Sequence, residues 1–171
     1  MIFDRERPVY EALDALSIPY TRYEHGEART MEALASFDTE HHCLHCKNLF
    51  LCNRQGTVFY LLLLVGEKKF RTAEVSKQLG VSRLSFATPE QLKSLLGLTP
   101  GEVTPMSLVN EKEPKVIVLL DRDILKEERL LVHPNVCTAS IELTTADLLK
   151  FLNSRGNRIE EVTLSDTPLH E

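Results

Sequence analysis

Histidine and cysteine are concentrated in one short stretch of the chain, residues 41–46, which reads HHCLHC. Both residue types are common zinc ligands, and the stretch contains two pairs at the two-residue spacing that zinc sites favour. Six consecutive residues cannot readily wrap one ion, so a structural site would need a second half, for which His133 and Cys137 are the candidates. The other interpretation is a polar lead-in with partly buried cysteines. The stretch supplies His41, His42, Cys43, His45 and Cys46.

The next residue is Lys47, and the sequence from there reads KNLFL. On a strand the side chains alternate, so Lys47, Leu49 and Leu51 share one face while Asn48 and Phe50 share the other. A lysine beside two leucines either extends its ammonium to the rim of the sheet or directs it into a cleft. In a cleft, its compact positive charge suits a phosphate or a carboxylate. The pattern leaves both interpretations open.

A second stretch suited to chemistry is residues 98–108, LTPGEVTPMSL. Pro105 restricts Thr104 to extended conformations, and Gly101 permits close approach of a ligand to the backbone. Exposed amides in such a rigid loop can stabilise the charge that develops on a reacting carbonyl. The alternative is an ordinary turn.

A third stretch is VHPN, residues 132–135, which places His133 at the end of an expected strand. An imidazole there can transfer a proton or orient another group by a hydrogen bond, and the alternative is an ordinary turn histidine. No serine or cysteine has a local nucleophile motif, and no glycine-rich loop of the Walker or dinucleotide-binding type is present. We therefore expect neither ATP nor NAD chemistry.

These residues need a scaffold, and the spacing of apolar residues predicts one of mixed α/β class. Residues 58–65 are apolar on both faces, which is typical of a central strand in a covered sheet. Strands and helices intermix without a regular βαβ repeat, so we expect a mixed sheet surrounded by helices. The predicted helices cover residues 5–16, 30–37, 72–79, 89–96 and 145–152, and the predicted strands 18–23, 47–53, 57–65, 116–120, 130–132, 138–143 and 159–164.

The composition limits the classes of function. A chain of 171 residues with 43% hydrophobic residues has the size of one domain, which we place at residues 1–164, with a tail at 165–171. A net charge of -5 argues against non-specific coating of nucleic acid. The apolar run 59–65 is too short to span a membrane and no secretory segment is recognisable, so we expect a cytoplasmic protein with reduced cysteines. A local basic patch, either a contact surface or a solvated helix face, contains Lys68, Lys69, Arg71 and Arg83.

Three stretches occur in one order that resembles a known family: KNLFL at 47–51, LSFATPEQLKSLLGLTPGEVTPMSLVN at 84–110 and HPNVCTASIELTTADLLKFL at 133–152. The chain is similar to the freestanding aminoacyl-tRNA editing proteins of the YbaK and prolyl-tRNA-synthetase-associated domain family. The most similar branch hydrolyses alanine mischarged onto proline tRNA. The resemblance covers nearly the whole chain. It implies a single α/β domain with a mixed, partly barrel-like sheet that receives the aminoacylated 3′ end of tRNA.

The resemblance also implies roles for individual residues. Lys47 matches the essential lysine that holds the terminal phosphate–sugar region, and Asn48 is its neighbour. Gly101 and Pro105 match the ends of a Gly-x-x-x-Pro loop whose backbone faces the aminoacyl carbonyl, and His133 matches the histidine of a His-Pro turn. Such enzymes let a ribose hydroxyl help to activate water, which implies no protein nucleophile, no metal and no cofactor. The implied partners are the acceptor end of mischarged tRNA and prolyl-tRNA synthetase, and we expect a monomer.

A second sieve for alanine is physically reasonable, because a synthetase pocket discriminates against a missing methylene by only about 1–3 kcal/mol. The sieve would need a small pocket that admits alanine and rejects proline. We selected further candidates by residue type and by proximity to the motifs. They are Asn48, Phe50, Met106, Ser107, Leu108, Asn135 and Thr138 for the substrate and Lys68, Lys69, Arg71 and Arg83 for tRNA.

Three functions therefore stay open. The first is a trans-editing deacylase acting on Ala-tRNA(Pro), with cysteine or serine as alternative mischarged amino acids. The second is a non-catalytic module of the same fold that binds tRNA or a synthetase. The third is a metal-dependent protein centred on residues 41–46.

Overall fold

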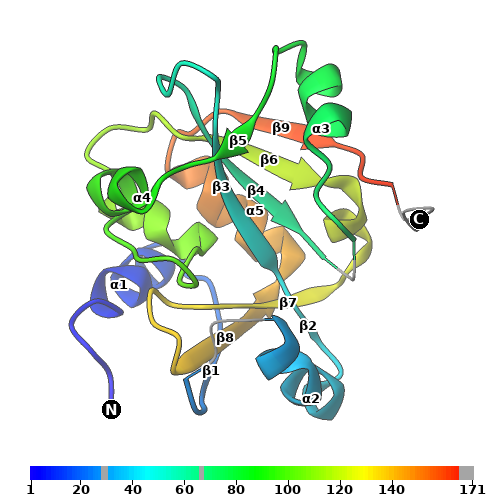
Figure 1. The fold of residues 1–171 in the computed structure, drawn as a ribbon. Coiled ribbons are helices and arrows are strands. Elements are labelled where there is room, and N and C mark those ends of the chain that lie inside the picture. Colours follow the sequence, from blue (N-terminus) through cyan, green and yellow to red (C-terminus); the bar gives the residue numbers. More distant parts are fainter. Residues whose placement is uncertain (28–30, 66–67, 166–171) are drawn as a thin grey trace.

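The computed structural model describes residues 1–27, 31–65 and 68–165 (Figure 1). Within these residues the strands form two separate mixed sheets, with helices packed around them. The α-helices are α1 (Arg7–Ala15), α2 (Met31–His41), α3 (Thr72–Leu79), α4 (Pro89–Leu96) and α5 (Thr145–Ser154), and the 3-10 helices are η1 (Pro105–Asn110) and η2 (Arg122–Lys126).

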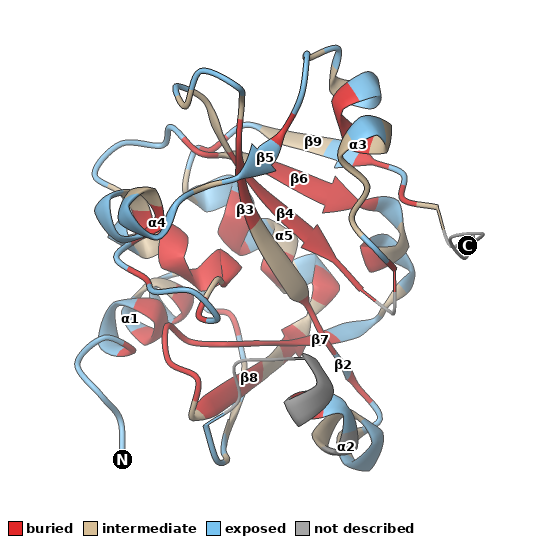
Figure 2. Cartoon of the chain, viewed as in Figure 1, coloured by how far each residue is buried: buried red, intermediate tan, exposed pale blue. Residues whose placement is uncertain are grey.

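The larger sheet has the order β5-β3-β4-β6-β9. Its strands are β3 (Lys47–Cys52), β4 (Phe59–Leu64), β5 (Ser85–Phe86), β6 (Ile117–Asp121) and β9 (Ile159–Val162). β3 and β4 form the predicted antiparallel hairpin, and β4 and β6 are parallel. β4 is central and buried, as the two-sided apolar pattern predicts (Figure 2).

The smaller sheet has the order β1-β8-β7-β2. Its strands are β1 (Thr21–Glu24), β2 (Leu44–His45), β7 (Arg129–Val132) and β8 (Ala139–Thr144). The expected mixed α/β class is confirmed, but the single partly barrel-like sheet is replaced by two open sheets. The chain changes sheets at Cys46, whose N–H donates to Leu131 of β7 before Lys47 pairs with β4, and Figure 1 shows β2 leading directly into β3.

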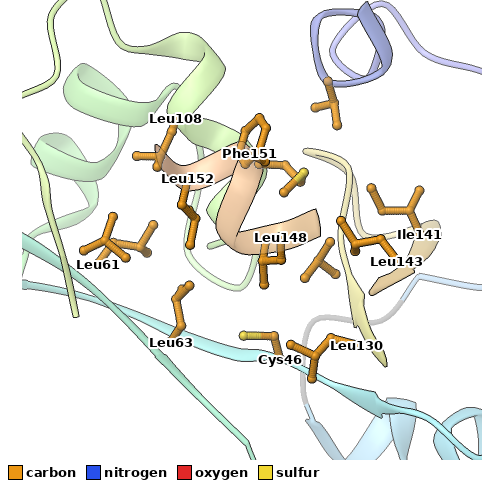
Figure 3. Close-up of a cluster of buried hydrophobic side chains, with 14 of the residues drawn as sticks. Cys46, Leu61, Leu63, Leu108, Leu130, Ile141, Leu143, Leu148, Phe151 and Leu152 are labelled. Atoms are coloured by element: carbon orange, nitrogen blue, oxygen red, sulfur yellow. The ribbon is translucent and has the colours of Figure 1, made fainter. Parts of the chain in front are cut away.

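The main core fills the space between the two sheets. Helix α5 contributes Leu148, Phe151 and Leu152, which pack between Leu61 and Leu63 of β4 and the side chains of the smaller sheet (Figure 3). A second apolar cluster lies on the other face of the larger sheet, where Leu62 and Leu64 of β4 belong to the same cluster as Val75 of α3.

Several helices begin and end at the capping residues that the sequence predicts. Thr88 and Gln91 form a capping box at the start of α4, and Gly97 ends that helix in the left-handed conformation, with φ 71°. The predicted helix 30–37 is observed as α2, which extends to His41; residue 30 lies outside the described residues, as do residues 166–171 of the predicted tail. No helix in the described part of the chain is long and apolar enough to cross a membrane.

Candidate active site

A cavity of about 700 Å³ opens beside the exposed edge of β3. Its walls come from α2, from β3, from β5 and α4 with the residue Ala87 between them, from the loop before η1, and from the turn after β7. It brings together five of the predicted catalytic and substrate-binding residues, although they lie up to 86 positions apart. Those five are Lys47, Asn48, Phe50, Gly101 and His133, and the other lining residues are Leu34, Cys46, Leu49, Phe86, Ala87, Pro89, Leu92, Pro100 and Val103.

Lys47 provides a positive charge on the cavity wall. It is the first residue of β3 and pairs with Leu64, whereas β5 covers the opposite edge of β3 only at Leu51 and Cys52. The first half of β3 is therefore less buried than β4 (Figure 2). The Lys47 ammonium forms no hydrogen bond or ion pair with the residues that the structure describes, so it is available to an anionic ligand.

Asn48 ties β3 to the glycine–proline loop. Its Nδ2 donates to the carbonyl oxygens of Cys46 and Val103, each at 3.1 Å. The Oδ1 atom of the same amide is buried and accepts no hydrogen bond from the described protein atoms. Asn48 therefore positions the loop through one end of its amide and retains one unused acceptor beside the cavity.

The loop itself is shaped by Gly101, which adopts φ 87°, a conformation that favours glycine. Next to it, the buried Glu102 accepts hydrogen bonds from Arg5 Nη2 and from the Thr99 N–H, both at 2.9 Å. Burial by itself would raise the pKa of the Glu102 carboxyl. The hydrogen bonds together have the larger, opposite effect, so the pKa lies below its usual value. The ionised carboxylate thus anchors a loop that exposes glycine backbone to the cavity.

His133 is a buried, neutral imidazole at the cavity wall. Burial lowers its pKa to about 4, against a smaller opposing effect of its hydrogen bond to Ala139. Because Nδ1 lies 3.1 Å from the Ala139 carbonyl oxygen, we assign the proton to Nδ1, and Nε2 remains an acceptor. The backbone carbonyl of His133 accepts from Thr104 Oγ1 at 2.6 Å, which joins this turn to the glycine–proline loop.

A hydrogen-bonded network beside His133 was not singled out from the sequence. His45 Nδ1 bonds to Asp38, and Ser140 Oγ lies 2.6 Å from His45 Nε2 and 2.8 Å from His25 Nε2. The order of groups resembles a catalytic triad, but Ser140 is fully buried and its hydroxyl lies between two imidazoles. The network therefore links α2, β2 and β8. No local sequence motif predicts this network, because its members come from distant segments of the chain.

One predicted catalytic residue, Pro105, and several predicted substrate contacts are not among the residues that line this cavity. Pro105, Met106, Ser107 and Leu108 are buried in η1, which turns Met106 and Leu108 into the main core, where Figure 3 shows Leu108 near α5. The reason is that the 3-10 helix packs its apolar side chains against helices instead of continuing the loop. The buried Asn135 donates to the Arg5 carbonyl at 3.4 Å, and the carbonyl of the partly buried Thr138 accepts from the His25 N–H at 2.9 Å.

The four residues of the predicted basic patch differ in how far they are buried. Lys68 is only 7% exposed, and its ammonium donates to both carboxylate oxygens of Asp121, at 3.0 and 2.9 Å, and pairs with Asp123. Although burial lowers the pKa of Lys68, these carboxylates raise it above its usual value. Lys68 is therefore a structural ion-pair partner, whereas Lys69 and Arg83 are exposed and Arg71 is partly buried.

The histidine–cysteine stretch does not converge on one point. Burial raises the pKa of Cys43 to about 11 and also raises that of Cys46, which points into the core (Figure 3). The His41 ring stacks on Phe37, and His42 is exposed. Among the described residues, no group of three or more histidine, cysteine, aspartate or glutamate side chains is arranged to hold a metal ion.

Comparisons with known proteins agree on one family. The sequence model of the aminoacyl-tRNA editing domain matches residues 25–151. The prolyl-tRNA editing protein ProX of Acetoanaerobium sticklandii is 32% identical over 164 residues, which cover 96% of this chain and all of that one. The prolyl-tRNA synthetase associated domain-containing protein 1 of Danio rerio is 31% identical over 87% of this chain and 82% of its own. The crystal structure of a protein provisionally assigned as a trans-editing enzyme for prolyl-tRNA synthetase has the same fold, with a TM-score of 0.72 at 22% identity, covering 95% and 99% of the two chains.

Proposed function

The chain belongs to the aminoacyl-tRNA editing domain family, and from that premise we propose that it is a trans-editing deacylase that hydrolyses Ala-tRNA(Pro). The observation that carries the proposal is the convergence of Lys47, Gly101 and His133 on one cavity. These residues come from three motifs whose order along the chain matches the family. We also propose that residues 1–164 form the editing domain and that prolyl-tRNA synthetase is the enzyme whose errors it corrects.

The proposed reaction is hydrolysis of the ester that joins the amino acid to the terminal ribose. Water attacks the carbonyl carbon, the bond from that carbon to the ribose oxygen breaks, and a proton from the water passes to the ribose oxygen. A neighbouring ribose hydroxyl helps to orient the water. The products are the free amino acid and tRNA with an intact terminal hydroxyl.

Each residue has a defined task in this scheme. The Lys47 ammonium binds the terminal phosphate, because it is a positive charge with no protein partner in the described part of the cavity. Backbone at Gly101 faces the oxygen that becomes negative during attack. His133, neutral over the physiological range, accepts a hydrogen bond through Nε2 and orients the ribose. Asn48 holds the glycine–proline loop against β3 through its Nδ2.

Selectivity for alanine would come from the apolar part of the cavity. Phe50 and Leu49 of β3, Val103 of the loop and Leu34 of α2 all line the cavity. A pocket narrowed by such side chains admits a methyl group more easily than a pyrrolidine ring. Discrimination of this kind rests on steric exclusion and not on a polar contact.

The decisive experiment offers the purified protein proline tRNA charged with alanine, cysteine, serine or proline, with and without a chelator. Selective release of alanine that is insensitive to chelator supports the proposal. Release of cysteine or serine instead keeps the deacylase and changes its substrate. Binding of tRNA without release of any amino acid favours a non-catalytic module. Chelator-sensitive release returns attention to residues 41–46.

A further inference from the structure

An exposed phenylalanine lies at the rim of the cavity. Phe86 of β5 is 62% exposed, although it also lines the cavity. The other exposed large hydrophobic side chains in the described chain do not line this cavity: Met1, Ile2, Phe3, Leu44 and Leu125. An aromatic ring that is open to solvent and continuous with a binding cavity offers a flat apolar face to a ligand.

The ring is held in a defined position. Phe86 pairs with Leu51 of β3, and the next residue, Ala87, donates its N–H to the Phe50 carbonyl at 3.0 Å. The Phe86 ring meets the half-buried Phe70 ring edge to face, with centroids 5.7 Å apart and an interplanar angle of 69°. Because strand pairing and the second ring limit its motion, Phe86 loses little conformational freedom when a ligand stacks on it.

The spacing along β3 suits one nucleotide. Phe86 pairs with Leu51, which lies four residues after Lys47, so the backbone positions of Phe86 and Lys47 are separated by about 13 Å along the strand direction. Both line the same cavity. A terminal nucleotide whose phosphate is bound by Lys47 can therefore extend its base along the strand towards Phe86.

Two exposed cations that are close in sequence to the two aromatic rings also suit a nucleic acid. Lys69 is exposed and adjacent to Phe70, and Arg83 is exposed three residues before Phe86. Neither side chain forms an ion pair with another residue in the described part of the chain. Exposed cations beside an aromatic ring are typical of surfaces that bind single-stranded nucleic acid, where the cations follow the phosphates and the ring stacks on a base.

We propose that Phe86 is the stacking platform for the terminal base at the 3′ end of tRNA. The inference rests on the proposed function, since it takes tRNA as the ligand of this cavity. Stacking on a ring reads no hydrogen-bond pattern, so this contact positions the nucleotide without selecting the base. It would place the ester within the cavity while the base remains at the rim.

The test uses an uncharged RNA hairpin with a single-stranded 3′ end whose last base is 2-aminopurine, a fluorescent adenine analogue. Titration with the wild-type protein should change the fluorescence and give a Kd. Phe86→Ala should weaken binding by about 5- to 100-fold, since stacking on one aromatic side chain is typically of that magnitude. Phe86→Tyr should restore affinity to within about threefold, whereas Phe86→Leu should not. Phe3→Ala, which removes an exposed phenylalanine outside the cavity, should leave the Kd unchanged.

The outcomes separate this inference from the proposed function. If wild-type protein releases alanine and Phe86→Ala binds and reacts normally, the stacking platform is wrong and the deacylase stands. If the fluorescence and Kd depend on Phe86 but no charged tRNA is hydrolysed, the platform stands and the deacylase fails. Unfolding curves for each variant show whether a lost signal reflects a lost fold, and recovery by Phe86→Tyr excludes that explanation.

Discussion

At the scale of single residues, two lysines of the same charge have opposite surroundings. Lys47 lies on a cavity wall without a partner among the described residues, whereas Lys68 is buried against Asp121. An unpartnered cation can bind a ligand, but a buried and paired one is already compensated and contributes to the fold. The environment therefore assigns the two side chains to different tasks.

Lys47→Ala should lower the rate of alanine release by about 100-fold or more, the size expected when a group that stabilises a charged centre is removed. The rate at protein concentrations well below saturation, which depends on substrate binding as well as on turnover, and the free energy of unfolding are the two measurements. Lys112→Ala is the matched control, because it removes an exposed lysine that lies outside both the cavity lining and the predicted basic patch. An unchanged rate of alanine release in Lys47→Ala below saturation would contradict the proposed mechanism.

His133 should make the fold sensitive to mild acid. Its pKa is about 4 in the folded protein and about 6.5 when unfolded, so the unfolded chain binds more protons between these values. The free energy of unfolding should therefore fall as the pH drops from about 6.5 to 4, by up to about 3 kcal/mol from this group. Urea titrations across that range should show a flatter profile for His133→Gln. An equal dependence of the free energy of unfolding on pH in the two proteins would rule out His133 as the origin of the acid sensitivity.

At the scale of elements, the site is built by ties between segments that are distant in sequence. Asn48 connects β3 to the glycine–proline loop, and Thr104 connects that loop to the turn at His133. The contact of His45 with Ser140 then connects β2 to β8. Each tie is a hydrogen bond in a buried or half-buried place, where an unmade bond is costly. The rigidity of the cavity wall therefore depends on these hydrogen bonds.

Thr104→Val tests one of these ties. The substitution keeps the shape of the side chain but removes the hydroxyl that donates to the His133 carbonyl and accepts from the Met106 N–H. It should lower the free energy of unfolding by about 1–3 kcal/mol, because buried polar groups lose their partner. It should also slow alanine release, since the loop and the turn are no longer joined. Thr104→Ser retains the hydroxyl and should behave nearly as the wild type.

At the scale of the whole molecule, two sheets share one core, and the chain passes between them at Cys46. The cavity opens next to this passage, because β5 covers the edge of β3 only at Leu51 and Cys52 and leaves the first half of the strand uncovered. The ion pair of Lys68 with Asp121 joins the segment after β4 to the end of β6. It therefore joins the ends of two neighbouring parallel strands in the interior of the larger sheet.

Lys68→Ala should lower the free energy of unfolding by about 3 kcal/mol or more, because Asp121 would remain buried without its cation. Lys69→Ala, at the neighbouring exposed position, should change it by less than about 0.5 kcal/mol. Denaturant curves of the two variants give the comparison. A similar small effect for both would mean that Asp121 finds another partner.

The sequence by itself determined the features that depend on neighbouring residues. The central strand β4 follows from an apolar run, the ends of α4 follow from Thr88 and Gly97, and the family follows from three ordered motifs. The short strands β2 and β5 were not predicted, since two residues carry too little periodicity.

Only the tertiary structure decided where several side chains lie. It placed Met106 and Leu108 in the core, paired Lys68 with Asp121 across 53 positions, and placed Ser140 between His25 and His45. Contacts of this kind depend on which surfaces meet after folding, and one sequence contains no local signal for them. Spacing along the chain can identify residues able to do chemistry, but packing between distant segments determines which of them reach the cavity.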